Sequence, residues 1–209
     1  TGDGRGTERG LHPWRFMLYA HDCVGFRLPD RLAFGRRGQP GLFTYFRNDW
    51  EPVFILQRPG GEGYCDAGII GEPFNPATKN KRSSLKRLAN GEMQRGKPTP
   101  YKDVVRRGTL WDYGNVGGPN CSGAQDIEAA GHPARWPYKL AHDIVVCFSA
   151  PGALVCDPFL GAGTTMIAAL EEGRRFIGGD LGARQTDGRA WVDVAADLWA
   201  ARQRQGRLS

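Results

Sequence analysis

The chain has 209 residues, 40% of them hydrophobic and 24% charged, which suffices for a packed domain and excludes wholesale disorder. No stretch approaches the roughly 18 apolar residues of a membrane span. Five cysteines without a Cys-x-x-Cys pair argue against a zinc site and a disulfide framework. We therefore expect a cytoplasmic protein that binds neither a membrane nor a metal ion.

The net charge of +6 is concentrated in one segment. Residues 79–107 carry ten basic side chains and two acidic ones, a net charge of +8, so the rest of the chain sums to −2. A basic block on a nearly neutral body is typical of a protein that binds a polyanion such as double-stranded DNA. The alternative is a solvated loop without a partner.

The first part of the chain predicts one helix and two strands, followed by a long irregular region. Apolar residues recur at helical spacing over residues 11–24, and Gly25 ends the pattern. Residues 27–36 and 51–58 have the composition of strands. Residues 59–131 are rich in glycine and proline, contain the basic block and show few periodic runs.

The last third of the chain alternates helical and strand patterns. In chain order these are a helix over 137–148, a strand over 153–156, a Gly-rich turn over 161–165, a helix over 166–172, a strand over 175–180 and an amphipathic helix from Trp191 to Trp199. Strands that alternate with helices in this way form a parallel sheet, so we expect an α/β fold.

The Gly-rich turn is the sharpest local signal. It follows an apolar strand and opens a helix in the run Val155-Cys156-Asp157-Pro158-Phe159-Leu160-Gly161-Ala162-Gly163-Thr164-Thr165, so its backbone N–H groups can approach a ligand closely. It is not a P-loop, because the lysine and the spacing of that motif are missing. As a dinucleotide fingerprint it is incomplete, since Met166 occupies the third glycine position. Asp180 follows at the end of the next strand, where it can accept both ribose hydroxyls of an adenosine.

Asp157 distinguishes between two classes of cofactor. A carboxylate just before the turn repels the pyrophosphate of a nicotinamide cofactor, which disfavours an oxidoreductase. The same charge attracts the ammonium and sulfonium groups of S-adenosylmethionine. A purely structural strand, turn and helix, with the acid as a cap, is the alternative interpretation.

Three segments together resemble the amino-methylating DNA methyltransferases: His132-Pro133-Ala134-Arg135-Trp136-Pro137, Asp157 to Thr165, and Gly173 to Asp180. Members of this family transfer a methyl group from S-adenosylmethionine to the exocyclic nitrogen of adenine or cytosine. The resemblance is to the circularly permuted group, in which the catalytic half comes first and the cofactor half last. It implies a doubly wound, mostly parallel sheet of the Rossmann-like type and a role in restriction–modification or phage modification.

The resemblance divides the chain into three regions and assigns residues to two sites. Residues 1–58 are the remainder of the catalytic half, 59–131 the basic target-recognition region and 132–209 the S-adenosylmethionine-binding half. The residues expected to bind the cofactor are His132, Pro133, Pro137, Asp157, Phe159, Gly161, Gly163, Thr164, Thr165 and Asp180. The residues expected to contact DNA are Lys79, Lys81, Arg82, Lys86 and Arg87.

The catalytic motif of the family is missing from this sequence. In the family an Asp, Asn or Ser followed by Pro-Pro and an aromatic residue binds the target amino group and stacks on the flipped base. This sequence contains no Pro-Pro, and residues 74–77 and 97–101, which look similar, follow no apolar strand. We therefore assign no catalytic residue and expect the motif upstream of Thr1. The strand over 153–156 is then expected to lack a neighbour along one edge, or to be covered there by a non-native segment.

Two functions remain open from the sequence. The first is a DNA methyltransferase of which this chain is a fragment, and the alternative is a catalytically inactive DNA-binding remnant of such an enzyme. An Asp-Pro-Pro-aromatic or Ser-Pro-Pro-aromatic segment in the upstream coding sequence separates the two.

The other polar and aromatic candidates receive structural interpretations. His142 has no metal-ligand spacing, and Cys156 is expected to pack inside a buried strand. Trp111 and Tyr113 either stack on bases or anchor a loop. Trp191 stands where the family has a tyrosine and is expected in the core.

Overall fold

The computed structural model describes residues 11–35, 50–73, 85–95, 104–113, 126–127, 130–132 and 136–206. They belong to two compact units, one of residues 1–66 and 108–209 and the other of residues 67–107. The two segments that resemble the catalytic motif, 74–77 and 97–101, lie outside the described residues.

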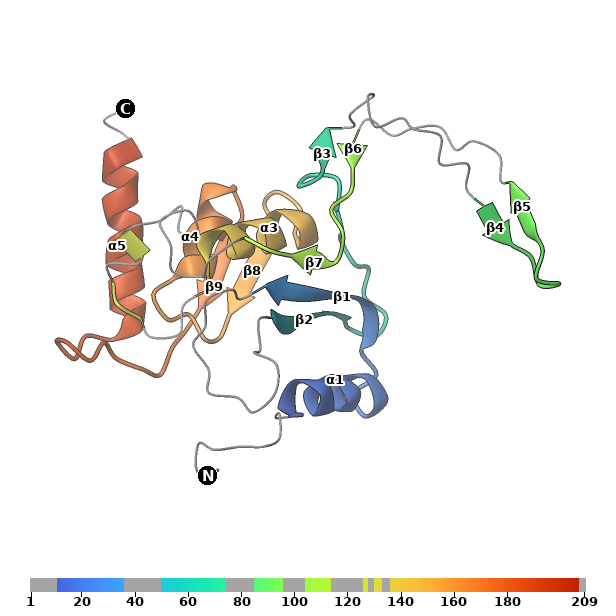
Figure 1. The fold of residues 1–209 in the computed structure, drawn as a ribbon. Coiled ribbons are helices and arrows are strands. Elements are labelled where there is room, and N and C mark those ends of the chain that lie inside the picture. The colour runs from blue at the N-terminus through green and yellow to red at the C-terminus, as the bar shows by residue number, and fades with distance from the viewer. Residues whose placement is uncertain are drawn as a thin grey trace, which may run out of the picture. The chain divides into compact units, whose positions relative to one another are not determined.

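A three-stranded sheet with one helix forms the first part of the larger unit (Figure 1). Its elements are α1 (His12–Asp22), β1 (Arg27–Gly35), β2 (Trp50–Gln57) and β7 (Leu110–Trp111). β1 is the central strand, antiparallel to β2 and parallel to β7. Trp14 of α1 meets Phe54 of β2 edge to face, with ring centroids 5.3 Å apart. The helix and the two strands predicted in this part of the sequence are confirmed.

A β-α-β unit flanked by two helices forms the second part of the larger unit. Its elements in chain order are α3 (Tyr138–Phe148), β8 (Leu154–Asp157), α4 (Thr164–Glu171), β9 (Arg175–Gly178) and α5 (Trp191–Gly206). β8 and β9 are parallel, and Asp157 at the end of β8 pairs with Gly178 at the end of β9. This is the predicted order of elements, and the α/β fold class is confirmed.

Helix α4 is the centre of the core. On one side Ile167 packs in a cluster with buried residues that include Trp191 of α5. On the other side Ala168 and Ala169 pack against α3 and against Val155 and Phe176 of the two strands. The expectation that Trp191 lies in the core is confirmed. Because α4 contacts helices and strands alike, its position fixes the end of the Gly-rich turn that leads into it.

The strand β8 differs from its prediction as a buried strand. Val155 faces the core, but Leu154 is 54% exposed and Cys156 is exposed, because successive side chains of a strand point to opposite faces and α3 and α4 pack on one face. The prediction that Cys156 packs inside the core is therefore wrong. Within the described part of the chain, β8 pairs with β9 along one edge and with no strand along the other.

The smaller unit contains two short antiparallel pairs in place of the irregular region that the sequence suggests. These are β3 (Glu72–Pro73) with β6 (Val104–Val105), and β4 (Leu85–Arg87) with β5 (Met93–Arg95). Gly91, with φ +88°, lies in the turn between β4 and β5. The Asn90 side chain accepts a hydrogen bond from the backbone N–H of Glu92, which helps to close this turn.

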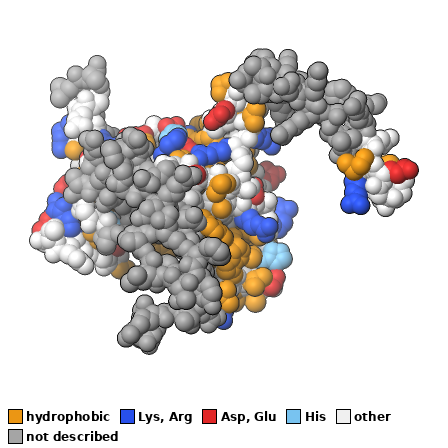
Figure 2. All heavy atoms as spheres, in the orientation of Figure 1, with side chains coloured by type: hydrophobic (Ala, Val, Ile, Leu, Met, Phe, Trp, Pro, Cys, Tyr) orange, Lys and Arg blue, Asp and Glu red, His pale blue; other side chains and the backbone are white. Residues whose placement is uncertain are grey.

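Large hydrophobic side chains are exposed around α1. Figure 2 shows a band of hydrophobic atoms over the region of α1, β1 and β2. Phe16, Leu18 and Tyr19 of α1 are more than half exposed, whereas Ala20 is buried against the sheet. In the described ranges, no helix combines the length and the apolar character that crossing a bilayer requires.

The glycines of the turn between β8 and α4 are required by close contacts. Gly163 has φ +86°, and a Cβ atom on it would lie 2.8 Å from the Cβ of Ala195 in α5. Gly161 has φ +51°, and a Cβ there would lie 3.1 Å from Nε2 of His132. A larger residue at either position would therefore be strained both by its backbone conformation and by its neighbour.

Replacing Gly163 tests this constraint. Gly163→Ala is expected to lower the free energy of unfolding by about 2–5 kcal/mol, since a left-handed backbone costs roughly 1–2 kcal/mol and overpacking roughly 1–3 kcal/mol. Gly173, with φ +70° and open space within 4 Å of the position that a Cβ would take, is the matched control, and Gly173→Ala should show the backbone cost alone. Urea denaturation measures both. Equal losses of stability in the two variants would show that the close contact with α5 adds nothing to the cost of replacing Gly163.

Candidate functional site

A cavity of about 560 Å³ lies beside the carboxyl end of β8. Part of the lining is polar and comes from His132, from Asp157 and from the turn, with Gly161, Ala162, Thr164 and Thr165. The rest, which we call the apolar wall, comes from Trp136, from α3 and from β8; its residues include Ile144, Val145, Phe148 and Leu154. A cavity of this size with few polar groups is typical of a site for a small molecule.

The parallel pairing of β8 and β9 brings two acidic residues to the same edge of the sheet. Asp157 is the last residue of β8, and Asp180 follows β9 by two residues. The backbone N–H of Gly179 donates to the carbonyl oxygen of Asp157 at 3.1 Å, and Leu160 donates to the carbonyl oxygen of Gly179 at 2.9 Å. The ends of the two strands are thus held together just where the Gly-rich turn begins.

Asp180 receives two hydrogen bonds from the backbone. Gly182 donates to one carboxylate oxygen at 2.6 Å, and Gly161 donates to the other at 2.8 Å. These bonds hold the pKa of the Asp180 carboxyl below its usual value, with a smaller contribution from the charge of His132. Because a carboxylate has about four acceptor positions, Asp180 retains the capacity to accept hydroxyl groups of a ligand.

Asp157 orders the beginning of the turn. One of its carboxylate oxygens accepts a hydrogen bond from the backbone N–H of Phe159 at 2.9 Å. This is a turn hydrogen bond and not a helix cap, because α4 has Gly163 as its N-cap and no side-chain cap. Asp157 also borders the cavity, so its negative charge faces any ligand bound there.

His132 covers the turn from the side of α3 and α5. Its ring lies against Gly161 and meets the ring of Trp191 edge to face, with centroids 4.6 Å apart. The imidazole therefore contributes to the cavity wall while it is held by the core. In the described part of the chain no group of three or more His, Cys, Asp or Glu side chains is arranged to hold a metal ion.

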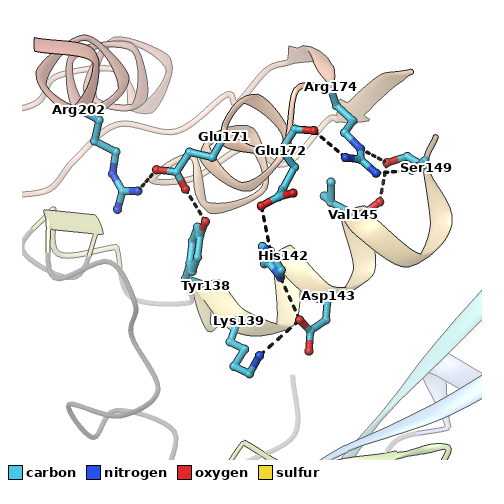
Figure 3. Close-up of polar contacts among 10 residues, drawn as sticks. All are labelled: Tyr138, Lys139, His142, Asp143, Val145, Ser149, Glu171, Glu172, Arg174 and Arg202. Atoms are coloured by element: carbon cyan, nitrogen blue, oxygen red, sulfur yellow. Dashed lines mark hydrogen bonds and ion pairs between the residues drawn. The ribbon is translucent and has the colours of Figure 1, made fainter. Parts of the chain in front are cut away.

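A polar network joins the ends of α3 and α4 beside the cavity (Figure 3). Arg174 is buried and donates to the carbonyl oxygens of Ser149 at 2.7 Å and Glu172 at 2.6 Å. His142 lies between two carboxylates, with Nδ1 3.0 Å from Asp143 and Nε2 3.1 Å from Glu172. Since Ser149 borders the cavity, this network fixes the far end of the apolar wall.

Comparison with known proteins decides the family. The profile of a DNA methylase family matches residues 3–187. The chain belongs to this DNA methylase family. Orphan methyltransferase M.BamHII of Bacillus amyloliquefaciens is 30% identical over 185 residues, which cover 88% of this chain and 68% of that protein. DNA adenine methyltransferase YhdJ of Escherichia coli K12 is 32% identical over 106 residues, which cover 50% of this chain and 34% of YhdJ.

Solved structures share the fold of this DNA methylase chain. PvuII DNA methyltransferase (cytosine-N4-specific) aligns with a TM-score of 0.57 and 16% identity, covering 91% of this chain and 64% of that protein. M1.HpyAVI, solved as a complex with SAM, aligns with a TM-score of 0.52 and 19% identity, covering 89% of this chain and 70% of that protein. This likeness concerns the fold alone. The chain spans about two thirds of the length of M.BamHII and of these two proteins, and about a third of YhdJ.

The residues that the sequence assigns to the cofactor are placed in different ways. Those that border the cavity are His132, Asp157, Phe159, Gly161, Thr164 and Thr165. Gly163 and Asp180 shape the turn without being part of the lining, and Pro137 is the N-cap of α3. Pro133 lies outside the described residues. The apolar wall was not assigned a role, although the helical pattern over residues 137–148 places Ile144, Val145 and Phe148 on one face.

The residues assigned to DNA are mostly outside the described part of this DNA methylase. Lys79, Lys81 and Arg82 lie outside it, whereas Lys86 and Arg87 belong to β4. Arg87 is exposed.

Trp111 of β7 and Tyr113, which follows it, are both held by hydrogen bonds from their side chains. Trp111 is buried, and its indole N–H donates to the carbonyl oxygen of Gly108 at 3.1 Å. The Tyr113 hydroxyl donates to the buried Asp143 at 2.8 Å. Of the two interpretations that the sequence left open, the structure supports the loop anchor.

The pH dependence of stability tests the contacts of Asp180. In the folded chain its pKa is lowered, so its stabilising contribution is complete above about pH 4, the usual pKa of an unfolded Asp, and is lost as the pH falls through the folded-state pKa. Asp180→Asn removes the ionisable group. Urea denaturation between pH 6 and pH 3 should show a shallower loss of stability in Asp180→Asn than in the parent protein. Parallel losses would contradict the account of these hydrogen bonds.

Proposed function

We propose that the cavity binds S-adenosylmethionine and that the DNA methylase containing this chain methylates the exocyclic amino group of adenine or cytosine in a specific DNA sequence. The observation that carries this proposal is the placement of Asp157 and Asp180 at adjacent strand ends, on either side of a Gly-rich turn. Two carboxylates at such a turn suit a cofactor with positive charge and a ribose, and they oppose a cofactor with a pyrophosphate.

The residues present fit this cofactor. Asp180 would accept the ribose hydroxyls, while Asp157, Phe159 and the turn from Gly161 to Thr165 would contact the methionine end. A cavity of about 560 Å³ is within the range of about 300–1,000 Å³ usual for small-molecule sites. M1.HpyAVI, which shares the fold, was solved as a complex with SAM. His132 would border the bound cofactor, with Pro137 starting the helix of the apolar wall.

The methyl transfer itself needs few groups from the protein. Bound S-adenosylmethionine supplies a methyl group that leaves the sulfonium sulfur for the amino nitrogen of the base, which loses a proton. This chain's residues would align the reactants and exclude water, and no metal ion is needed for such a step. One sequence relative is a DNA adenine methyltransferase, and one solved structure of similar fold is a cytosine-N4-specific enzyme. We therefore propose adenine or cytosine as the target base.

The catalytic motif is the part of the proposal that this sequence does not supply. Residues 1–58 would belong to the catalytic half, 59–131 to target recognition and 132–209 to cofactor binding. The edge of β8 that pairs with no described strand would receive the strand that bears the motif. The absence of Pro-Pro from the sequence favours one second candidate, a DNA-binding remnant without catalysis. Transfer of a labelled methyl group to DNA by the protein encoded by the complete reading frame separates the two.

The basic block is proposed as the contact to DNA. Its ten basic residues and the exposed Arg87 on β4 support this role, because phosphate contacts by Lys and Arg supply most of the affinity of DNA-binding proteins. A two-stranded ribbon such as β4–β5 is also an element that the major groove can admit.

The cofactor assignment is tested by Asp180→Ala. Loss of a charged acceptor costs roughly 1.5–3 kcal/mol for each hydrogen bond, and tenfold in affinity corresponds to about 1.4 kcal/mol. Isothermal titration of the folded protein with S-adenosylmethionine should therefore show binding at least about tenfold weaker. Asp187→Ala is the matched control, since Asp187 pairs with Arg184 in the same connection to α5. Equal affinity of Asp180→Ala and the parent protein would refute the assignment.

The DNA assignment is tested by the salt dependence of binding. Reversing the charges of Lys81, Arg82, Lys86 and Arg87 to Glu should reduce the slope of log affinity against log salt by up to about 3.6, since each phosphate contact contributes roughly 0.9. The control reverses four exposed arginines of the larger unit, Arg15, Arg27, Arg31 and Arg58, which changes the net charge equally. An unaltered slope in the first variant would mean that the block is a solvated surface.

A further inference from the structure

Several described residues before α3 pack in the core or border the cavity, and we call residues 126–127, 130–132 and 136–138 the strap. Ile127 and Ala130 are buried in the cluster that includes Trp191, while His132 and Trp136 border the cavity. The lining that these two residues supply therefore depends on what holds the strap to α4 and α5.

The side chain of Arg202 in α5 ties both ends of the strap. Its Nε and Nη2 atoms donate to the two carboxylate oxygens of Asp126, each at 2.7 Å. Its Nη1 atom donates to Glu171 of α4, and the same carboxylate accepts a hydrogen bond from the hydroxyl of Tyr138 (Figure 3). One guanidinium thus reaches the first residue of the strap directly and the last residue through Glu171.

This arrangement differs from an ordinary surface ion pair. The side chain of Arg202 is 17% exposed, and its guanidinium lies 5.8 Å from the centre of the Tyr138 ring. The hydrogen bonds from Arg202 lower the pKa of the Asp126 carboxyl despite its partial burial. Two parallel hydrogen bonds from a planar guanidinium fix orientation as well as distance, which the single charge of a lysine does not.

We propose that Arg202 is a positioning residue for the cofactor cavity. Its guanidinium holds the strap so that His132 lies against Gly161 and Trp136 borders the cavity. Without this hold, His132 and Trp136 are in place in a smaller fraction of molecules, and the apparent affinity for a ligand falls with that fraction. This inference rests on the proposed binding of S-adenosylmethionine for its functional consequence, but the hold on the strap is measurable without ligand.

The first test measures hydrogen exchange in the ligand-free protein. Arg202→Met should accelerate amide exchange of residues 130–138 by about tenfold or more, while exchange of α4 changes much less, because release of the strap is a local opening. Arg202→Lys should give an intermediate acceleration. Arg189→Met is the matched control, since Arg189, just before α5, forms an exposed ion pair with Asp197 of α5. Unchanged exchange of residues 130–138 in Arg202→Met would overturn the proposal.

The second test separates positioning from a general loss of stability. Leu32→Ala removes a buried side chain from β1 and serves as a destabilised reference. Titration with S-adenosylmethionine should show weaker binding for Arg202→Met, by the factor by which the fraction of binding-competent molecules falls, and unchanged binding for Leu32→Ala. Binding by Arg202→Met that equals binding by the parent would overturn the proposal. If the parent protein binds no S-adenosylmethionine, the proposed function fails for this chain, and the exchange measurement still decides whether Arg202 holds the strap.

Discussion

The hydrogen bond from the Gly161 amide to the Asp180 carboxylate is the contact on which the geometry of the cavity depends. It joins the turn after β8 to the end of β9, and the backbone bonds between Asp157, Gly179 and Leu160 complete this connection. The turn then passes so close to α5 and His132 that glycine is required at Gly161 and Gly163. A short parallel strand pair thereby places two carboxylates, a helix start and a histidine around one site.

A second constraint links the two sheets of the larger unit. Asp143 of α3 is almost completely buried, and a carboxylate in such a position is costly unless it is hydrogen-bonded. Tyr113, which follows β7, donates to it, and Lys139 and His142 of α3 lie beside it. The ring of Tyr113 also contacts Phe34 of β1, so the network connects the sheet of β1 to the helix that forms the apolar wall. Removing one partner would leave part of a buried charge without compensation.

The sequence predicted the elements well because their signals are local. Helical and strand periodicity placed α1, α3, α4 and the longer strands within a few residues, and the Gly-rich run identified the turn of the cavity. The start of α5 was also found, but this helix continues beyond Trp199 to Gly206. The contacts that join distant segments had no such signal. His142 and Glu172 are 30 residues apart, and Asp126 and Arg202 are 76 residues apart, so their pairing follows from helix packing and not from any spacing. The exposure of Cys156 was missed for a related reason, since a short apolar run does not reveal which of its faces is covered.

The central claim is that the carboxyl ends of β8 and β9 bind the adenosyl cofactor. A crystal structure of the protein with S-adenosylhomocysteine, the product of methyl transfer, tests it most directly. The ribose hydroxyls should lie within hydrogen-bond distance of the Asp180 carboxylate, and the amino-acid end should lie against the turn from Gly161 to Thr165, with Asp157 beside its ammonium group. Density for the ligand at another place, or a ribose that does not contact Asp180, would contradict this binding site.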